Sequence, residues 1–255
     1  MGTRCFFALL LTVGLVASAG TALASGDDPP PIVLELEGGA FWQSRNDVQI
    51  PNDETGTRFS LVDVAGSGPW PAGRIYATWN INPRHSLRAL AAPLSITETG
   101  VPATDIRFAG DEFGAGVPLE ATYQFNSWRL GYRYRFHEGD RWAWWVGFTA
   151  KVRDAKIELR QGTTSARKTD VGFVPLLHIE GLFRVSDNWR VVLDADALAG
   201  GPGRAEDASL KIYRDIGEHW SVAAGYRTVE GGADVDEVYN FAWLHYAVLS
   251  VSYGF

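Results

Sequence analysis

Cysteine is almost absent from this sequence of 255 residues, and its single copy, Cys5, lies close to the amino terminus. A framework of disulfide bonds, on which small exported proteins often depend, is therefore excluded. Methionine is equally rare, and no stretch after residue 24 has the uninterrupted apolar character of a membrane-spanning helix. An excess of positive charge is also lacking, since the formal net charge is −7, and this argues against a nucleic-acid partner.

The first 24 residues have the layout of a secretory signal peptide. Arg4 lies in a short charged start, an apolar run follows, and Ala22 and Ala24 form a small-x-small cleavage motif. Cleavage after Ala24 would leave one domain, residues 25–255, with no cysteine. Cys5 lies before the apolar run, where the acceptor cysteine of a lipoprotein would not be. An uncleaved membrane anchor is the alternative.

Glycine and aromatic residues are abundant, with 28 Gly, 10 Trp, 9 Tyr and 13 Phe, and this balance favours strands and tight turns. Alternating segments joined by short connections predict four β-hairpins, at residues 74–94, 126–152, 176–198 and 209–229. Longer polar stretches separate the hairpins, at residues 46–57, 97–118, 161–170, 200–207 and 231–239. Short connections therefore alternate with long ones along the chain.

The predicted strands have a period of two, with charge confined to one face. From Trp142 onward the first face carries Trp142, Trp144, Val146, Phe148, Ala150 and Val152, and the other carries Gly147, Thr149, Lys151 and Arg153. The preceding strand places Trp128, Leu130, Tyr132, Tyr134 and Phe136 on one face and Arg129, Gly131, Arg133 and Arg135 on the other. Five tryptophans near the short turns could form an interfacial girdle: Trp79, Trp142, Trp144, Trp189 and Trp220.

The chain ends on an uncharged strand, "AVLSVSYGF", in which Leu249, Val251, Tyr253 and Phe255 share one face. With the signal peptide and the asymmetric hairpins, this ending resembles the small bacterial outer-membrane β-barrel proteins. The resemblance implies that these four residues form the signal read by the barrel-insertion machinery. It also implies periplasmic chaperones during assembly, contact with outer-membrane lipid and lipopolysaccharide, a Gram-negative outer-membrane location and a monomeric state.

The expected fold is all-β, a closed antiparallel up-and-down transmembrane barrel of about ten strands, with eight and twelve as alternatives. A sheet in lipid must close on itself, because its backbone groups find no water to bind. Residues 57–66 are ambiguous and could be the upper part of the second strand, a rim element or an extra strand. Pro175 has no backbone donor, which indicates a bulge or a rim position.

The face opposite the apolar one collects charges of both signs. In a narrow barrel these side chains either pair with one another and fill the lumen or line a small pore or ligand pocket. The predicted lumen charge network comprises Arg129, Arg133, Lys151, Arg153, His178, Glu180, Asp194, Asp196, Lys211 and Arg227. Glu35 and Glu37 have the same parity.

The chemistry expected from this sequence is structural, or that of a narrow channel. No cofactor is implied, and no metal site, because histidine and cysteine show no short-range pairing. Barrels of this size also include proteases and lipid A-modifying enzymes, so an enzyme is one alternative, and a soluble lipocalin-like binder is another. The candidate catalytic groups form no specific motif: His178 with Glu180, Asp194 with Asp196, Glu206 with Asp207, and Asp236 and Glu237 with His245.

Overall fold

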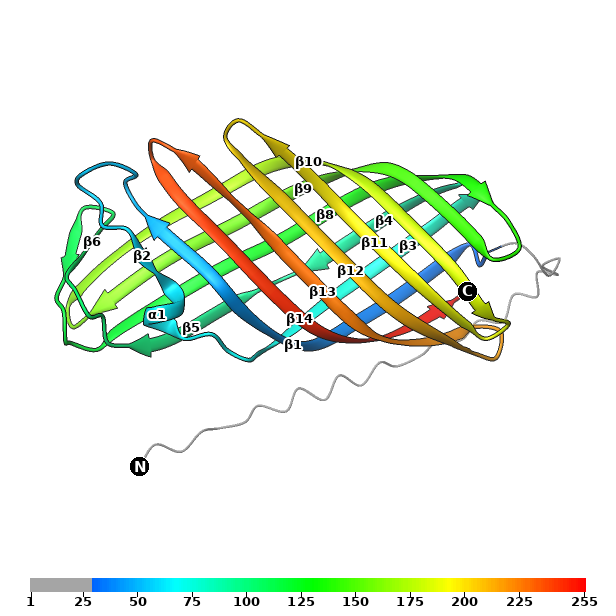
Figure 1. The fold of residues 1–255 in the computed structure, drawn as a ribbon, viewed down its shortest axis with the longest axis horizontal. Coiled ribbons are helices and arrows are strands. Elements are labelled where there is room, and N and C mark those ends of the chain that lie inside the picture. The colour runs from blue at the N-terminus through cyan, green and yellow to red at the C-terminus, as the bar shows by residue number, and fades with distance from the viewer. Residues whose placement is uncertain (1–28) are drawn as a thin grey trace, which may run out of the picture.

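The computed structural model describes residues 29–255. The predicted signal peptide, with Cys5 and the cleavage site after Ala24, lies outside the described residues. Within residues 29–255, no helix combines the length and the apolar character needed to cross a membrane. Most of this part of the chain is extended and forms one tilted, twisted sheet (Figure 1).

Ten antiparallel strands close into a barrel. Each pairs with the next along the chain, and the last closes the ring against the first, from Val33 opposite Gly254 to Gln49 opposite Tyr239. The predicted all-β up-and-down barrel of about ten strands is confirmed. The strands are β1 (Ile32–Gln49), β3 (Trp70–Asn82), β4 (His85–Ala92) continued by β5 (Ser95–Gly100), β8 (Leu119–Glu138), β9 (Trp142–Gln161), β10 (Thr164–Ser186), β11 (Trp189–Gly200), β12 (Gly203–Ile216), β13 (Trp220–Val235) and β14 (Val238–Gly254).

Four short turns lie at one end of the barrel, together with the carboxyl terminus (Figure 1). The opposite end differs from expectation, because the predicted long connections 161–170, 200–207 and 231–239 are mostly strand. Tight turns join β9 to β10, β11 to β12 and β13 to β14 there. Most polar residues of these segments, with the exception of the buried Asp207, lie on strands that continue beyond the apolar part of the barrel, so the composition of the segments resembled that of loops.

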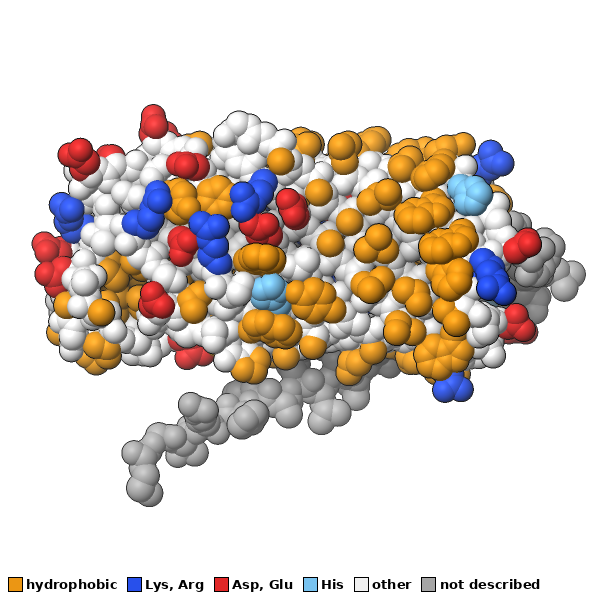
Figure 2. Space-filling view, viewed as in Figure 1, with side chains coloured by type: hydrophobic (Ala, Val, Ile, Leu, Met, Phe, Trp, Pro, Cys, Tyr) orange, Lys and Arg blue, Asp and Glu red, His pale blue; other side chains and the backbone are white. Residues whose placement is uncertain are grey.

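The faces of the strands follow the predicted alternation around the short-turn half of the barrel. On β8 and β9, Leu130 and Phe148 point outward and are 56% and 60% exposed, whereas Arg129 and Lys151 point inward and are buried. Outward hydrophobic side chains form a broad band around this half, with charged side chains gathered beyond it (Figure 2). We call this surface the apolar band. An apolar outer surface of this kind is typical of a barrel surrounded by lipid.

Tryptophans mark the short-turn edge of this band. Trp79, Trp142, Trp189 and Trp220 are all exposed on the outer surface, as an interfacial girdle requires. Trp144 is less exposed, because its ring lies against the backbone of Gly181 on β10. A Cβ atom at Gly181 would lie 2.6 Å from that ring, so glycine is needed for the close approach.

In the other half of the barrel the two faces of the strands exchange their chemical character. Beyond Val152 on β9, the outward side chains become charged, and the inward side chains Ile157 and Leu159 are buried among other apolar residues. A hairpin of β6 (Ile106–Phe108) and β7 (Asp111–Phe113) adds Phe108 and Phe113 to this interior. This half, which we call the outer half, therefore has the charged surface and apolar core of a protein in water.

Residues 57–66 form a rim element that completes the wall of the outer half. β3 pairs with β1 only as far as Phe41, so the upper part of β1 needs other partners. The short strand β2 (Phe59–Ser60) and the helix α1 (Leu61–Ala65) occupy this place, between β1 and β5. Gln43 binds the loop after the helix, donating its Nε2 to the Gly66 oxygen at 2.6 Å.

The wall is lowest at the turn between β11 and β12. β10 pairs with β11 only from Leu177 downward, so within the described chain its upper residues, 164–176, pair with β9 on one side alone. Pro175 lies at the start of this unpaired edge, where a missing backbone donor does not interrupt a ladder. The structure records no bulge in the β9–β10 pairing at Pro175 and places this residue in the middle of β10, so it lies on an unpaired strand edge and not at a bulge or at the rim.

Candidate functional site

Charged side chains fill the lumen inside the apolar band. Six cations and six carboxylates form ion pairs there, and all reach inward from alternate positions of the barrel strands. The set is formally neutral, so attraction between its members offsets part of the cost of removing them from water. We call these twelve residues the lumen cluster: Arg74, Arg88, Arg129, Arg133, Lys211, Arg227, Glu35, Glu37, Glu180, Asp194, Asp196 and Asp207.

Asp207 on β12 lies at the centre of the lumen cluster and is only 3% exposed. Three guanidinium groups from three other strands surround its carboxylate. Arg74 and Arg129 donate to Oδ2 at 2.8 and 2.6 Å, and Arg227 donates to Oδ1 at 2.5 Å. Such charge-assisted hydrogen bonds are stronger than bonds between neutral groups. They join β3, β8, β12 and β13 across the lumen.

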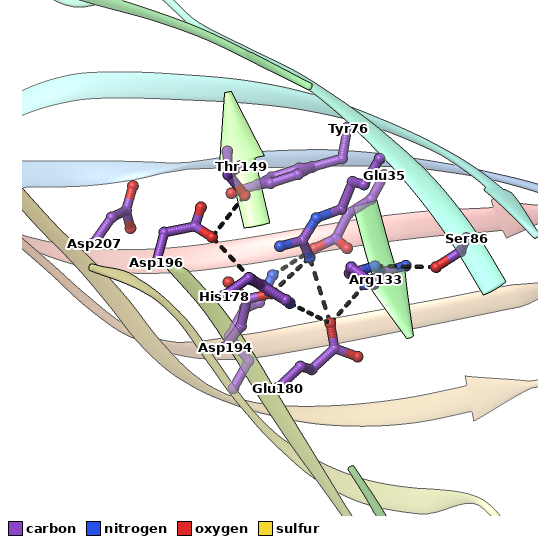
Figure 3. Close-up of polar contacts among 12 residues, drawn as sticks. Glu35, Tyr76, Ser86, Arg133, Thr149, His178, Glu180, Asp194, Asp196 and Asp207 are labelled. Carbon is purple, nitrogen blue, oxygen red and sulfur yellow. Dashed lines mark hydrogen bonds and ion pairs between the residues drawn. The ribbon is translucent and has the colours of Figure 1, made fainter. Parts of the chain in front are cut away.

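A second group of ion pairs lies toward the short turns. Arg133 donates to Glu180 at 2.6 Å, and Arg88 donates to Asp194 at 2.6 Å, so that β8 and β4 are bridged to β10 and β11. Figure 3 shows Arg133, Glu180 and Asp194 close to His178. Both carboxylates are therefore neutralised by arginine, which leaves little attraction for a further cation.

His178 has the surroundings of an oriented histidine but lacks the partner that catalysis would need. Its Nδ1 lies 2.9 Å from Asp196 Oδ1, which also accepts a hydrogen bond from the Thr149 hydroxyl. In the described part of the chain, its Nε2 has no hydrogen-bond partner, and the nearest carboxylate, Glu180, lies 3.8 Å away. A nucleophile activated by this histidine would have to lie at Nε2.

Three possible metal ligands meet at the same place. Ligand atoms of His178, Glu180 and Asp194 lie within 4.8 Å of one another. Arg88 and Arg133 already bind the two carboxylates, and a divalent cation would have to displace these guanidinium groups or lie beside them. The arrangement therefore fits an ion-paired core better than a metal centre.

The other acid and histidine candidates do not converge. Glu206 and Asp207 are neighbours on a strand and face opposite sides, so that Glu206 is exposed and Asp207 is buried. His245 lies on the outer surface, where it binds the Tyr226 hydroxyl and stacks on Trp42. The Nε2 of His245 also lies 2.8 Å from the Ser44 hydroxyl, but within the described residues no hydrogen bond joins this histidine to Asp236 or Glu237.

The predicted network residues have different places in the structure. Seven of them belong to the lumen cluster, and His178 is hydrogen bonded to it. Arg153 instead pairs with Asp170 in the outer half, and Lys151 has no carboxylate partner within 4 Å among the described residues. The seven are Arg129, Arg133, Glu180, Asp194, Asp196, Lys211 and Arg227.

Three central members of the lumen cluster were missed: Arg74, Arg88 and Asp207. Asp207 was assigned to a long polar loop, and the tight turn between Gly200 and Gly203 places it on β12 instead. Arg74 and Arg88 lie on the two strands of the first predicted hairpin. Each occupies a position whose side chain points inward from its strand. Applying the alternation to every hairpin would have found both arginines.

Space is distributed unevenly along the barrel. Two cavities beside the lumen cluster have volumes of about 10 and 20 Å³, so each is about large enough for one water molecule. A larger cavity of about 370 Å³ lies above the cluster, in the outer half. We call it the upper cavity. Its lining includes Lys151, Phe125, Tyr123, Ile157, Val229 and Leu244.

Two ion pairs also line the upper cavity. Arg153 pairs with Asp170, and Arg204 pairs with Glu230. The hydrogen bond to Glu230 raises the pKa of Arg204, so this guanidinium stays charged at any physiological pH. These pairs connect β9 with β10 and β12 with β13, on either side of the low wall above the β11–β12 turn.

Comparison with known proteins supports the fold without identifying a family. No family model matches the sequence, and no curated protein is similar to it. The outer-membrane protease OmpT of Escherichia coli has a similar structure, with a TM-score of 0.52 and 8% identity over 90% of this chain and 97% of that one. The attachment invasion locus protein Ail of Yersinia pestis, with a TM-score of 0.40 and 11% identity, matches over 88% of this chain and 99% of that one. The chain thus has the fold of the outer-membrane β-barrels.

Proposed function

We propose that this chain is an integral outer-membrane protein of a Gram-negative cell, with a lumen that is closed inside the apolar band. It then acts as a structural or surface protein, not as an open pore. The observation that carries this proposal is the lumen cluster, whose balanced charges leave cavities of only about 10 and 20 Å³ beside it. An open channel needs a continuous water-filled path lined by polar groups.

The apolar band supports membrane insertion over a soluble lipocalin-like binder. Its side chains cover the outside of the barrel, and a soluble barrel would expose this surface to water at a large cost. We also propose that Leu249, Val251, Tyr253 and Phe255 form the signal for the insertion machinery. Leu249, on the outer face of β14, and Phe255, directly after this strand, are 67% and 60% exposed, so another protein can reach them.

An enzymatic role has less support, because His178, the histidine that a carboxylate orients in the described part of the chain, is buried within the closed lumen. A substrate could reach it only if the surrounding ion pairs separated. We therefore propose a non-enzymatic protein that acts as a monomer in lipid and lipopolysaccharide.

Planar-bilayer recordings test the closed lumen. The purified wild-type protein should show no steady conductance. Replacing both Asp194 and Asp196 with alanine leaves Arg88 and Arg129 without these partners and should either open a path for ions or lower stability. Alanine at Asp140 and Asp187, two exposed acids in short turns, is the matched control and should change neither property. A large, charge-selective conductance of the wild type would overturn the proposal.

A further inference from the structure

The upper cavity is polar at one end and apolar at the other, with a cation at its floor and apolar walls above. Lys151 lies opposite Arg129 on β8, at the upper edge of the lumen cluster. Four residues farther along β9, Ala155 lies opposite Phe125, and Ile157 lies opposite Tyr123. From the other side of the barrel, β13 and β14 contribute Val229, Ala242 and Leu244 to the cavity. The walls are therefore mostly hydrocarbon and aromatic.

Lys151 is the uncompensated charge of this region. It is 3% exposed, and in the part of the chain that the structure describes no carboxylate oxygen lies within 4 Å of its ammonium group. The lumen cluster below it is already balanced, with six cations against six carboxylates. The contact that the ammonium does make is with the ring of Phe125, whose centroid is 4.8 Å from Nζ. A cation–π contact replaces only part of the lost hydration.

The other charges of the cavity do not neutralise Lys151. Asp170 pairs with Arg153, and Glu230 pairs with Arg204. Glu237 is exposed in the turn between β13 and β14, at the solvent end of the cavity. Lys168 adds a further positive charge from β10. The interior of the cavity consequently has an excess of positive charge.

We propose that the upper cavity binds an amphipathic organic monoanion, with its acidic head on Lys151 and its apolar body against the walls above. A carboxylate would give the buried ammonium the charged hydrogen bond that it lacks. The volume of about 370 Å³ is within the range of small-molecule sites. Specific ligands of apolar cavities are held by a few such polar groups, which fix the orientation.

The low wall above the β11–β12 turn gives the ligand its entrance. Lys168, Asp170 and Val174 line the cavity from the unpaired edge of β10, and Arg204 and Ala205 line it from β12. β11 pairs with Arg204 and Ala205 and ends at Gly200, so above this point no strand of the described chain lies beside the edge of β10 at Lys168 and Asp170. The outer surface of β10 beside this entrance is apolar, with Val171 and Phe173 exposed. A molecule with an apolar body can therefore approach along this surface.

Calorimetric titration of the full-length protein in lipid nanodiscs tests the proposal, with empty nanodiscs as the blank. Three probes share one apolar body and differ in the head: 4-phenylbutanoate, 4-phenylbutan-1-ol and 4-phenylbutylamine. The anion should bind saturably and at least about tenfold more tightly than the alcohol, because a hydrogen bond to a charged group has roughly this effect. The amine should bind more weakly than both. Equal affinities for anion and amine, or no saturable binding of the anion, would overturn the proposal.

The variant Lys151→Met keeps the length of the side chain and removes its charge. Affinity for 4-phenylbutanoate should fall about tenfold or more, and affinity for the alcohol should change little. Arg167→Met is the matched control, because it removes a cation from the exposed outer face of β10, outside the cavity. If Lys151→Met and the control bound the anion equally well, the assignment of Lys151 would be wrong. The comparison of the three probes on the wild type remains decisive if the variant does not fold.

Discussion

Neutralising Asp207 should destabilise the barrel more than any other single change in the lumen cluster. Asparagine has nearly the same shape as aspartate and keeps one acceptor oxygen, so Asp207→Asn removes charge without creating a cavity. Three guanidinium groups then face a neutral amide. Arg74 is affected most, because its remaining carboxylate, Glu37, lies 3.7 Å away.

The expected magnitude follows from the burial of the groups involved. Asp207 and its three arginine partners are all buried, so water cannot replace the lost charge. Removing one partner of a buried ion pair typically costs about 3–5 kcal/mol, mainly because the other charge stays buried and unpaired. We expect a loss in this range for Asp207→Asn. The change Glu206→Gln, at the exposed neighbouring residue, should alter stability by less than about 0.5 kcal/mol.

Reversible urea unfolding in lipid vesicles measures the difference in the free energy of unfolding between each variant and the wild type. Heat-dependent gel mobility is a second measure of barrel folding. A double variant that adds Arg74→Gln to Asp207→Asn restores the balance of charge. Its stability should be higher than the sum of the two single losses predicts, with a coupling energy on the order of 0.5–3 kcal/mol. Equal midpoints for Asp207→Asn and Glu206→Gln would refute the central role of this carboxylate.

Three further substitutions test the carboxyl-terminal signal, the lipid-facing surface of the apolar band and the wall of the outer half. Phe255→Asp should impair assembly into the outer membrane and leave aggregated or degraded protein in the periplasm; normal amounts of assembled barrel would contradict the proposed signal. Phe148→Arg places a charge on a lipid-facing site and should lower the stability in bilayers by about 2–4 kcal/mol, and an unchanged unfolding curve would show that this face is not in lipid. Gly100→Ala brings a Cβ atom within 1.8 Å of the backbone oxygen of Val64 in α1, so trypsin should cleave near the displaced helix faster than in the wild type. Gly114→Ala, where the nearest atom is 3.7 Å away, is the control, and equal cleavage of both variants would count against the packing of α1.

The sequence alone determined the fold class and the two faces of the strands in the apolar band. Both depend on a local rule, because a period of two separates inward from outward side chains whatever the partner strand is. The terminal strand was readable for the same reason, since Leu249 and Phe255 lie on one face of an uncharged segment. Closure of the sheet followed from the lack of water in lipid, without knowledge of any contact.

Only the tertiary structure decided which charges meet and where space remains. Arg74 and Asp207 are separated by 133 residues, and their contact depends on the register and tilt of every strand between them. The same geometry decides that Lys151 lies above the balanced cluster, without a carboxylate partner in the described chain. The upper cavity depends on the unequal lengths of the hairpins. These lengths could not be predicted from the polar composition, because a strand in water and a loop contain similar residues. Alternation assigns a side chain to the lumen, but the height at which it lies there is set by the closed barrel.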